Sequence, residues 1–169
     1  MEQKLDEIAI NLLDQLIAIP SFSKEEDKTA LTLEGFFKSF NIPTERKGNN
    51  VWARNQHFSA ELPTILLNSH HDTVRPNSGY TRDPFKADIG DGKLFGLGRN
   101  DAEGPLVCLI ATFLNFYSQQ NLKFNLVLAA TAEEEISGTG GIESIWDLLP
   151  NIDFGIVGVN VVFAAVFCG

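Results

Sequence analysis

Apolar residues recur at helical spacing through the first forty residues and predict two helices. Residues 5–17 carry an apolar side chain every three or four positions, and Pro20 lies just beyond them. Ser23 followed by Glu26 has the spacing of a capping box, and an apolar stripe from Ala30 to Phe40 comes after it. We therefore expect one amphipathic helix before Pro20 and a second that begins at the capping box.

Strand and helix signals then alternate along the rest of the chain. Apolar runs without alternation, as in strands covered on both faces, occur at 65–67 and 124–131. The remaining patterns predict a hairpin turning at 47–50, a loop over 73–99 with a short excursion at 93–95, helices from Pro105 past Tyr117 and over 142–149, and a strand from Phe154. This order predicts an α/β fold of three layers, with a mostly parallel sheet and helices on both faces.

Composition indicates a folded domain that avoids polyanions. The 169 residues are 44% hydrophobic and carry a formal charge of −9, which disfavours nucleic acid and anionic membranes as partners. Cys108 and Cys168 form no motif and indicate no disulfide framework, the apolar stretch 156–168 is too short to span a bilayer, and the acidic N-terminus shows no secretory signal. A cytoplasmic location is expected.

Imidazole and carboxylate groups follow the apolar strands and form the candidate site. His70 and Asp72 come directly after the first buried strand, Asp101 precedes a predicted helix, and residues 133–135 are three glutamates after the second buried strand. Ligands of such sheets bind outside the carboxyl ends of the strands. This set of groups suits a divalent metal ion, with a spare carboxylate to activate water. The pattern therefore indicates a metallohydrolase.

Neighbouring groups within the site can divide the roles. His70 and Asp72 lie two residues apart and point to the same side if the chain is extended, so one can bind metal while the other orients it. Glu134 and Glu135 are adjacent, so one can be a ligand and its neighbour a general base. His71 is expected to pack or to form hydrogen bonds.

Less specific readings apply to other groups. Asp101 could act only as a helix cap, and an acidic run such as 133–135 is normally a solvated face, although here it follows a buried strand. The glycines of 96–104 do not form a phosphate-binding loop, because the segment is acidic and no Lys-Ser/Thr follows. His57 lies among polar residues and is expected to be exposed.

Three motifs give the chain a specific resemblance to a known family. Residues 69–74 (SHHDTV), 96–104 (GLGRNDAEG) and 131–135 (TAEEE) resemble the His-x-Asp, Gly-x-Gly-x-x-Asp-x-x-Gly and paired-glutamate elements of the zinc-dependent deacylase and carboxypeptidase superfamily. That superfamily includes acetylornithine deacetylase, succinyl-diaminopimelate desuccinylase, aminoacylase and carboxypeptidase G. The resemblance covers roughly residues 5 to 158, and it is greatest to acetylornithine deacetylases.

The resemblance implies a role for each site residue. His70 would bind a first zinc with Asp72 as its orienting partner, Asp101 would bridge two ions, Glu135 would bind the second, and Glu134 would be the general base. Two divalent ions are implied, zinc in the first place and cobalt as an alternative. The implied reaction is hydrolysis of the amide bond of an N-acyl amino acid, as by an N-acetylornithine deacetylase of arginine biosynthesis. The metal-binding side chains should meet at neighbouring strand ends, and the Asp101–Ala102 peptide should be cis.

The sequence departs from the family pattern in two places. Glu103 stands where the family usually has Lys or Gly, a change expected to affect only the local charge. Val159 and Asn160 stand where the family has a Glu-Pro pair whose glutamate is a further ligand. We therefore expect residues 1–158 to be the N-terminal part of the catalytic domain and 159–169 a departing tail, either an ad hoc strand or poorly ordered. The dimerisation domain and the C-terminal catalytic half would be absent.

These departures leave several functions open. The chain as it stands is expected to be an inactive truncated form that binds metal weakly and is poorly soluble, whereas a full-length relative would be a homodimer acting on a small N-acyl amino acid. Aminopeptidase or dipeptidase activity is the near alternative, because the metal core is shared. A non-catalytic fragment is the alternative from a different class.

Overall fold

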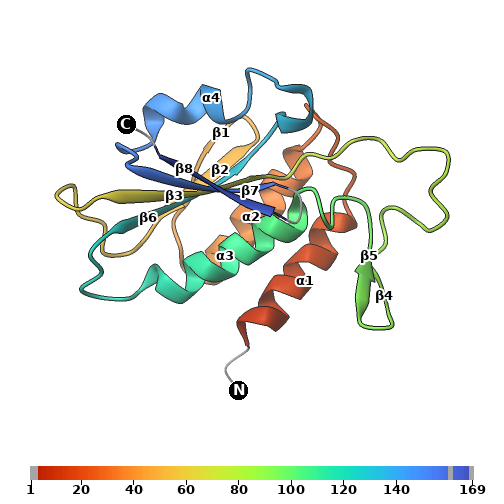
Figure 1. Cartoon of the computed structure of the whole chain (residues 1–169), viewed down its shortest axis with the longest axis horizontal. Coiled ribbons are helices and arrows are strands. Elements are labelled where there is room, and N and C mark those ends of the chain that lie inside the picture. The colour runs from red at the N-terminus through yellow and green to blue at the C-terminus, as the bar shows by residue number, and fades with distance from the viewer. Residues whose placement is uncertain (1–3, 160–161, 168–169) are drawn as a thin grey trace.

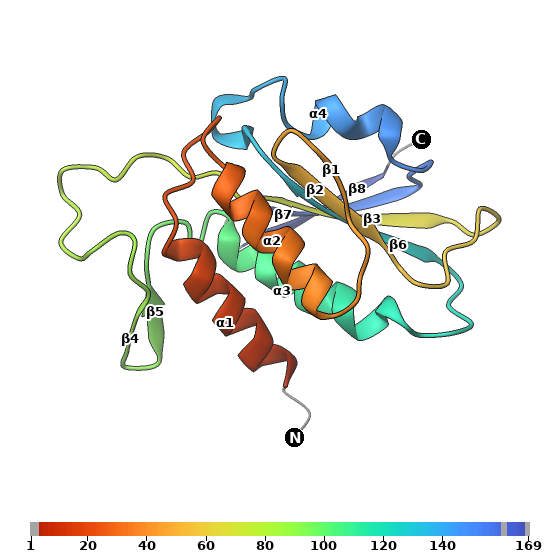
Figure 2. The ribbon, with the colours of Figure 1, turned by 180° about the vertical axis from the view of Figure 1, so that it is seen from behind.

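The computed structural model places a mixed, six-stranded sheet between two layers of helices. It describes residues 4–159 and 162–167. Helices α1, α2 and α3 cover one face of the sheet and α4 the other (Figures 1 and 2). In chain order the elements are α1 Leu5–Ile17, α2 Asp27–Ser39, β1 Glu45–Lys47, β2 Asn50–Arg54, β3 Thr64–His70, β4 Asp88–Gly90, β5 Lys93–Phe95, α3 Glu103–Tyr117, β6 Asn125–Thr131, the 3-10 turn η1 Glu134–Ile136, α4 Ile142–Ile145, the 3-10 turn η2 Trp146–Leu148, β7 Phe154–Val159 and β8 Val162–Phe167.

The two strands with continuous apolar runs lie side by side at the centre of the sheet. The strand order is β1-β2-β6-β3-β7-β8, and β3 is parallel to both β6 and β7. Strands β2 and β8 flank this parallel centre in antiparallel orientation. In the register of β3 with β6, His70 pairs with Thr131, so the two strands end at the same edge of the sheet.

Alternate residues of the central strands supply two separate cores. Leu126, Leu128 and Ala130 pack under α1, α2 and α3, together with Phe37 and Phe113. Val127 and Ala129 face the opposite side and pack with Trp52, Ile145 and Leu149. The sheet is thus buried on both faces, which explains why its central strands lack the polar alternation of a half-exposed sheet.

The α/β fold class and the order of elements predicted from the sequence are confirmed. The parallel character is confined to the central strands, and the hairpin predicted around residues 47–50 forms the antiparallel pair β1–β2. The excursion at 93–95 is one strand of a small separate hairpin, β4–β5. In the tail, residues 162–167 form β8 against β7, the first of the two outcomes expected for it.

The predicted capping box is wrong. Helix α2 begins at Asp27, and its N-cap is Glu26, whose side chain makes no capping hydrogen bond. The hydroxyl of Ser23 instead donates a hydrogen bond to Asp72, 49 residues away in the sequence. The local motif is overridden here by a tertiary contact to a buried carboxylate.

Two further expectations concern cysteines and membrane spans. Cys108 is a free, exposed thiol, whereas Cys168 and Asn160 lie outside the described residues. Among the helices of the described segments, none combines the length and apolarity needed to cross a bilayer.

Helix α2 offers a test of the core beneath the sheet. Leu33 is fully buried, whereas Leu31 on the same helix is 54% exposed. We expect Leu33→Ala to lower the free energy of unfolding by about 2–5 kcal/mol, because the loss of buried apolar surface and the cavity left behind both destabilise the fold. The matched change Leu31→Ala should alter it by no more than about 0.5 kcal/mol. Urea unfolding followed by circular dichroism measures both, and equal losses would contradict the assigned register of the helix.

Candidate metal centre

His70 is the last residue of β3, and the sheet holds it in a buried position. Its side chain is 1% exposed, and the next backbone amide, that of His71, donates a hydrogen bond to the carbonyl of Thr131 at the end of β6. Because β3 and β6 are parallel, the segment that follows Thr131 leaves the sheet beside His70. The three glutamates at 133–135 are therefore delivered to the imidazole by the strand register.

Asp72 fixes both the imidazole and the glutamate segment. Its Oδ1 lies 3.2 Å from His70 Nδ1 and accepts the amide of Glu134 at 3.1 Å, while Oδ2 accepts the amide of Glu135 at 3.1 Å and the hydroxyl of Ser23 at 2.7 Å. The carbonyl oxygen of Asp72 also lies 3.0 Å from His70 Nδ1. These contacts assign the proton of the neutral ring to Nδ1, so Nε2 presents its lone pair to the opposite side.

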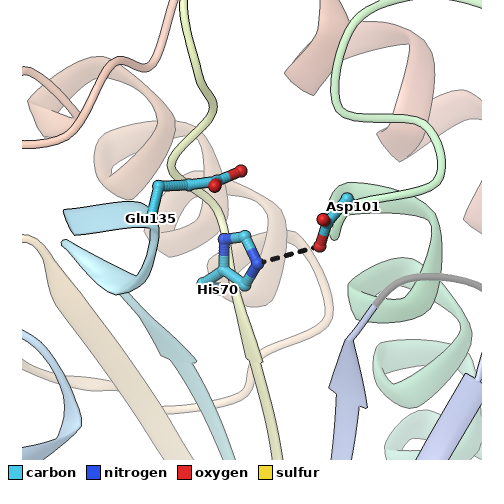
Figure 3. Close-up of side chains that lie close together, drawn as sticks. All are labelled: His70, Asp101 and Glu135. Carbon is cyan, nitrogen blue, oxygen red and sulfur yellow. Dashed lines mark hydrogen bonds and ion pairs between the residues drawn. The ribbon is translucent and has the colours of Figure 1, made fainter. Parts of the chain in front are cut away.

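Three potential ligand atoms converge on that opposite side. One ligand atom from each of His70, Asp101 and Glu135 lies within 4.8 Å of the others. His70 Nε2 lies 3.3 Å from Asp101 Oδ1 and 3.5 Å from Glu134 Oε2. Figure 3 shows the carboxylates of Glu135 and Asp101 on two sides of the imidazole ring, with Asp101 joined to it by a dashed line. The predicted approach of these groups is confirmed, and the Asp101–Ala102 peptide is cis as expected.

The charges around His70 explain the titration of the site. Burial opposes protonation of His70, but the hydrogen bond and charge of Asp72 and the charge of Glu134 outweigh it and raise its pKa to about 9. Burial also acts to raise the pKa of Asp72, yet hydrogen bonds from His70, Ser23 and the two amides lower it to about 2. The pKa of Glu135 is raised by burial and by neighbouring carboxylates, Asp101 among them. A cation would relieve this repulsion between carboxylates.

The remaining histidines behave as the sequence indicates. His71 is fully buried, with Nε2 2.9 Å from the carbonyl of Asn49 and Nδ1 2.8 Å from the hydroxyl of Thr29. Burial lowers its pKa, so the ring is neutral and belongs to the scaffold. His57 is exposed.

Glu103 is buried, whereas the sequence led us to expect a change in local charge alone. The side chain is 1% exposed, and its Oε2 has no hydrogen-bond partner within the described part of the chain. Burial raises its pKa to about 8, so it is mainly uncharged at neutral pH. No sequence signal distinguished this glutamate from an exposed residue in the first turn of α3.

Sequence reasoning also missed the contact partners of Asp72. The sequence pattern predicts that Ser23 and Glu26 form the two halves of a helix cap. In the structure Ser23 bonds to Asp72, and Glu26 is fully buried near the glutamate segment. The pairing of these residues with groups far along the chain follows from the tertiary fold alone. The roles of the five predicted site residues as ligands, orienting group and base stay predictions; they are His70, Asp72, Asp101, Glu134 and Glu135.

Comparison with known proteins places this geometry in a family. Residues 66–166, more than half of the chain, match Peptidase family M20/M25/M40. A succinyl-diaminopimelate desuccinylase of Buchnera aphidicola subsp. Cinara cedri is 32% identical over 163 residues, which cover 88% of this chain and 42% of that protein. The chain thus spans about two fifths of the length of the curated relatives it matches.

Solved structures show the same fold. An M20 family metallo-carboxypeptidase from Sulfolobus solfataricus superposes with a TM-score of 0.68 at 26% identity, covering 89% of this chain and 37% of its own. A dinuclear metal-binding peptidase of the M20 family from Bacillus subtilis superposes with a TM-score of 0.63 at 16% identity, over 88% and 41% of the two chains.

Metal binding at this site should release a proton. The pKa of His70 is about 9 without metal, so a cation must displace a proton from the imidazole at pH 7. We expect zinc affinity to rise by up to about tenfold per pH unit between pH 6 and 8. Calorimetric titrations in buffers of different ionisation enthalpy count the released proton. His57→Ala, at an exposed histidine, should leave that count unchanged, and an affinity independent of pH would contradict the assignment.

The buried Glu103 should make stability depend on pH. Its folded pKa of about 8 exceeds the ordinary value of 4.5, so its contribution is full below about pH 4.5 and is lost as pH rises toward 8. In urea unfolding with a chelator present, Glu103→Gln should gain roughly 2–4 kcal/mol over the unmodified chain between pH 5 and 8. The exposed Glu61→Gln is the control. Parallel stability curves for all three proteins would show that Glu103 is ionised in the fold.

Proposed function

Because the chain belongs to peptidase family M20/M25/M40, we propose that its site hydrolyses the amide bond of an N-acyl amino acid with the help of divalent metal ions. The observation that carries this proposal is the convergence of His70, Asp101 and Glu135, whose ligand atoms lie within 4.8 Å of one another. A further carboxylate, that of Glu134, lies 3.5 Å from His70 Nε2. Ligands and base are thus available on one side of the imidazole.

The donor set fits a divalent ion of the zinc type. One imidazole nitrogen and carboxylate oxygens are common zinc ligands, and cobalt accepts the same donors. His70, Asp101 and Glu135 would hold the metal, and the dinuclear M20 peptidase of Bacillus subtilis favours two ions over one. The ions would supply a polarised carbonyl and an acidic water.

Residues of this chain supply the proton transfers and the orientation. Asp72 holds the Nδ1 proton of His70, so that the lone pair of Nε2 is directed toward the other carboxylates of the site. Glu134 is the proposed general base: its carboxylate is 51% exposed and reaches the side of the imidazole where water can enter. It would accept a proton from the attacking water and return it to the leaving amine, while Asp72 stays ionised throughout.

The acyl group is proposed from the names of the relatives. Curated relatives that match this chain are succinyl-diaminopimelate desuccinylases, so an N-succinyl amino acid takes precedence over the N-acetylornithine expected from the motifs. Both are N-acyl amino acids, and the same attack cleaves either. The acetylornithine assignment and its place in arginine biosynthesis find no support in these names.

Peptidase activity is the second candidate. The solved structures that resemble this fold include a metallo-carboxypeptidase and a tripeptidase from Staphylococcus aureus. A peptide bond and an N-acyl bond are both amides, so the same ligands and base serve either reaction. The choice then depends on groups that recognise the two ends of the substrate.

A chimera tests the proposed reaction beyond the length of this chain. Residues 5–158 would replace the matching segment of the Buchnera desuccinylase, and N-succinyl-diaminopimelate, N-acetylornithine and a dipeptide would be assayed with zinc and with cobalt. The Buchnera segments supply the remaining substrate contacts, so a working site should cleave the N-succinyl substrate in a metal-dependent way, whereas the 169 residues alone should show negligible turnover. A folded, zinc-loaded chimera that cleaves none of the three substrates would contradict the proposed site.

Glu134→Gln in the same chimera tests the base. An amide keeps the shape of the side chain but accepts no proton, so turnover should fall by about 10²–10⁴-fold while zinc content stays unchanged. Metal analysis and kcat are measured together. The control is Glu143→Gln, at an exposed glutamate on α4. Full activity of Glu134→Gln would show that another group takes the proton.

A further inference from the structure

Glu26 is a second buried carboxylate beside the glutamate segment. It is fully buried, and its Oε1 accepts the amides of Lys24 at 2.8 Å and of Glu133 at 3.1 Å. Its Oε2 accepts the side-chain amide of Asn49 at 2.8 Å. A buried carboxylate is stable only where such donors replace water. Glu26 therefore has the bonding of a structural anion, with one bond to the segment that carries the proposed base.

Two buried carboxylates together hold three consecutive amides. Glu26 accepts the amide of Glu133, and Asp72 accepts those of Glu134 and Glu135. The segment is thus fixed through its backbone, which leaves the side chains of Glu134 and Glu135 free for the site. Glu134 and Glu135 follow Glu133 directly in the chain. A displacement of the Glu133 backbone would therefore also shift the side chains of these two glutamates.

The backbone conformation of Glu133 is one that this attachment helps to hold. Its φ is 56°, in the left-handed region, which is costly for a residue with a side chain. Its carboxylate accepts the amide of Gly140 at 3.3 Å. A Cβ added at Gly138 or Gly140 would lie 2.2 Å from a Glu133 oxygen, so the loop closes tightly around this side chain. Only the last two glutamates of the run remain with the metal ligands.

The carboxylate of Glu26 is also connected, through hydrogen bonds, to the end of β3. Asn49, which donates to Glu26, also accepts the Nε2 proton of His71 on its carbonyl oxygen at 2.9 Å. A carbonyl oxygen only accepts, so this bond defines the tautomer of the neutral ring. His71 is the chain neighbour of His70. Glu26 thus connects, through Asn49 and His71, the strand that carries the imidazole with the segment that carries the carboxylates.

We propose that Glu26 is a positioning residue: it sets the distance between His70 on β3 and the Glu134–Glu135 pair by holding the amide of Glu133. It touches neither metal nor substrate. This role deepens the proposed function of the site and rests on it. A residue that merely stabilises the fold would affect the whole sheet equally, whereas a positioning residue acts on residues 133–135 and on metal affinity.

Three variants of the 169-residue chain separate these roles. Glu26→Ala removes the acceptor of the Glu133 amide, and Glu26→Gln keeps one oxygen in its place. The matched control is Glu25→Ala, one residue earlier, where the side chain is 61% exposed and pairs with Arg75. Amide hydrogen exchange at Glu133–Glu135 and at the core residues of β6 is measured by NMR without metal, and zinc affinity is measured by competition with a chelator.

The expected result is local. Glu26→Ala should speed exchange at Glu133–Glu135 by about tenfold or more relative to β6, as loss of one charged hydrogen bond implies. Zinc affinity should fall by about 10–100-fold, as for other groups that orient ligands. Glu26→Gln should recover most of both, and Glu25→Ala should change neither. If Glu26→Ala does not fold, Glu26→Asp, which withdraws the oxygens by one methylene, takes its place with the same expectations.

Two results would overturn the positioning role. One is exchange that rises equally in β6 and at residues 133–135, or does not rise at all. The other is faster local exchange with unchanged zinc affinity, which would show that the site does not depend on this attachment. The exchange measurement needs neither metal nor substrate, so it reports on Glu26 even if N-acyl amino acids prove not to be cleaved. Failure of the proposed function is read separately, from turnover.

Discussion

The arrangement of the site depends on one buried anion, the carboxylate of Asp72. An ionised group without solvent exposure is costly, and the fold offsets that cost with contacts from the His70 ring, the hydroxyl of Ser23 and the amides of Glu134 and Glu135. Each contact comes from a different part of the chain or orients a different site residue. Satisfying this anion therefore brings the imidazole and the paired glutamates into fixed relative positions.

The parallel register of β3 and β6 makes that convergence possible. Since both strands end at the same edge, the residues that follow them need only a short turn to meet. Asp101 arrives differently, from the segment just before α3, and its side chain is 47% exposed. One part of the site is thus held by the sheet and by buried hydrogen bonds, whereas Asp101 approaches from the solvent side.

Much of this could be predicted from the sequence because it depends on local patterns. Apolar periodicity indicated α1, α3 and the central strands, and the spacing of the motifs indicated which side chains meet. The rest depends on contacts between distant residues. Ser23 has the sequence context of a helix cap yet bonds to Asp72, and Glu103 has that of an exposed helix start yet is buried. Neither outcome is encoded within a few residues, because each is decided by which neighbour the tertiary fold supplies.

The run of three glutamates shows how backbone geometry divides identical side chains between roles. In a regular strand Glu133 and Glu135 would share a face, and Glu134 would point away from both. The left-handed turn at Glu133 breaks that alternation, sending its carboxylate to the Gly138–Gly140 loop while Glu134 and Glu135 face His70. That turn is strained and persists because buried acceptors hold the amides on either side of it. The carboxylates gathered around His70 then repel one another, and a cation bound between them would stabilise the fold by removing that repulsion.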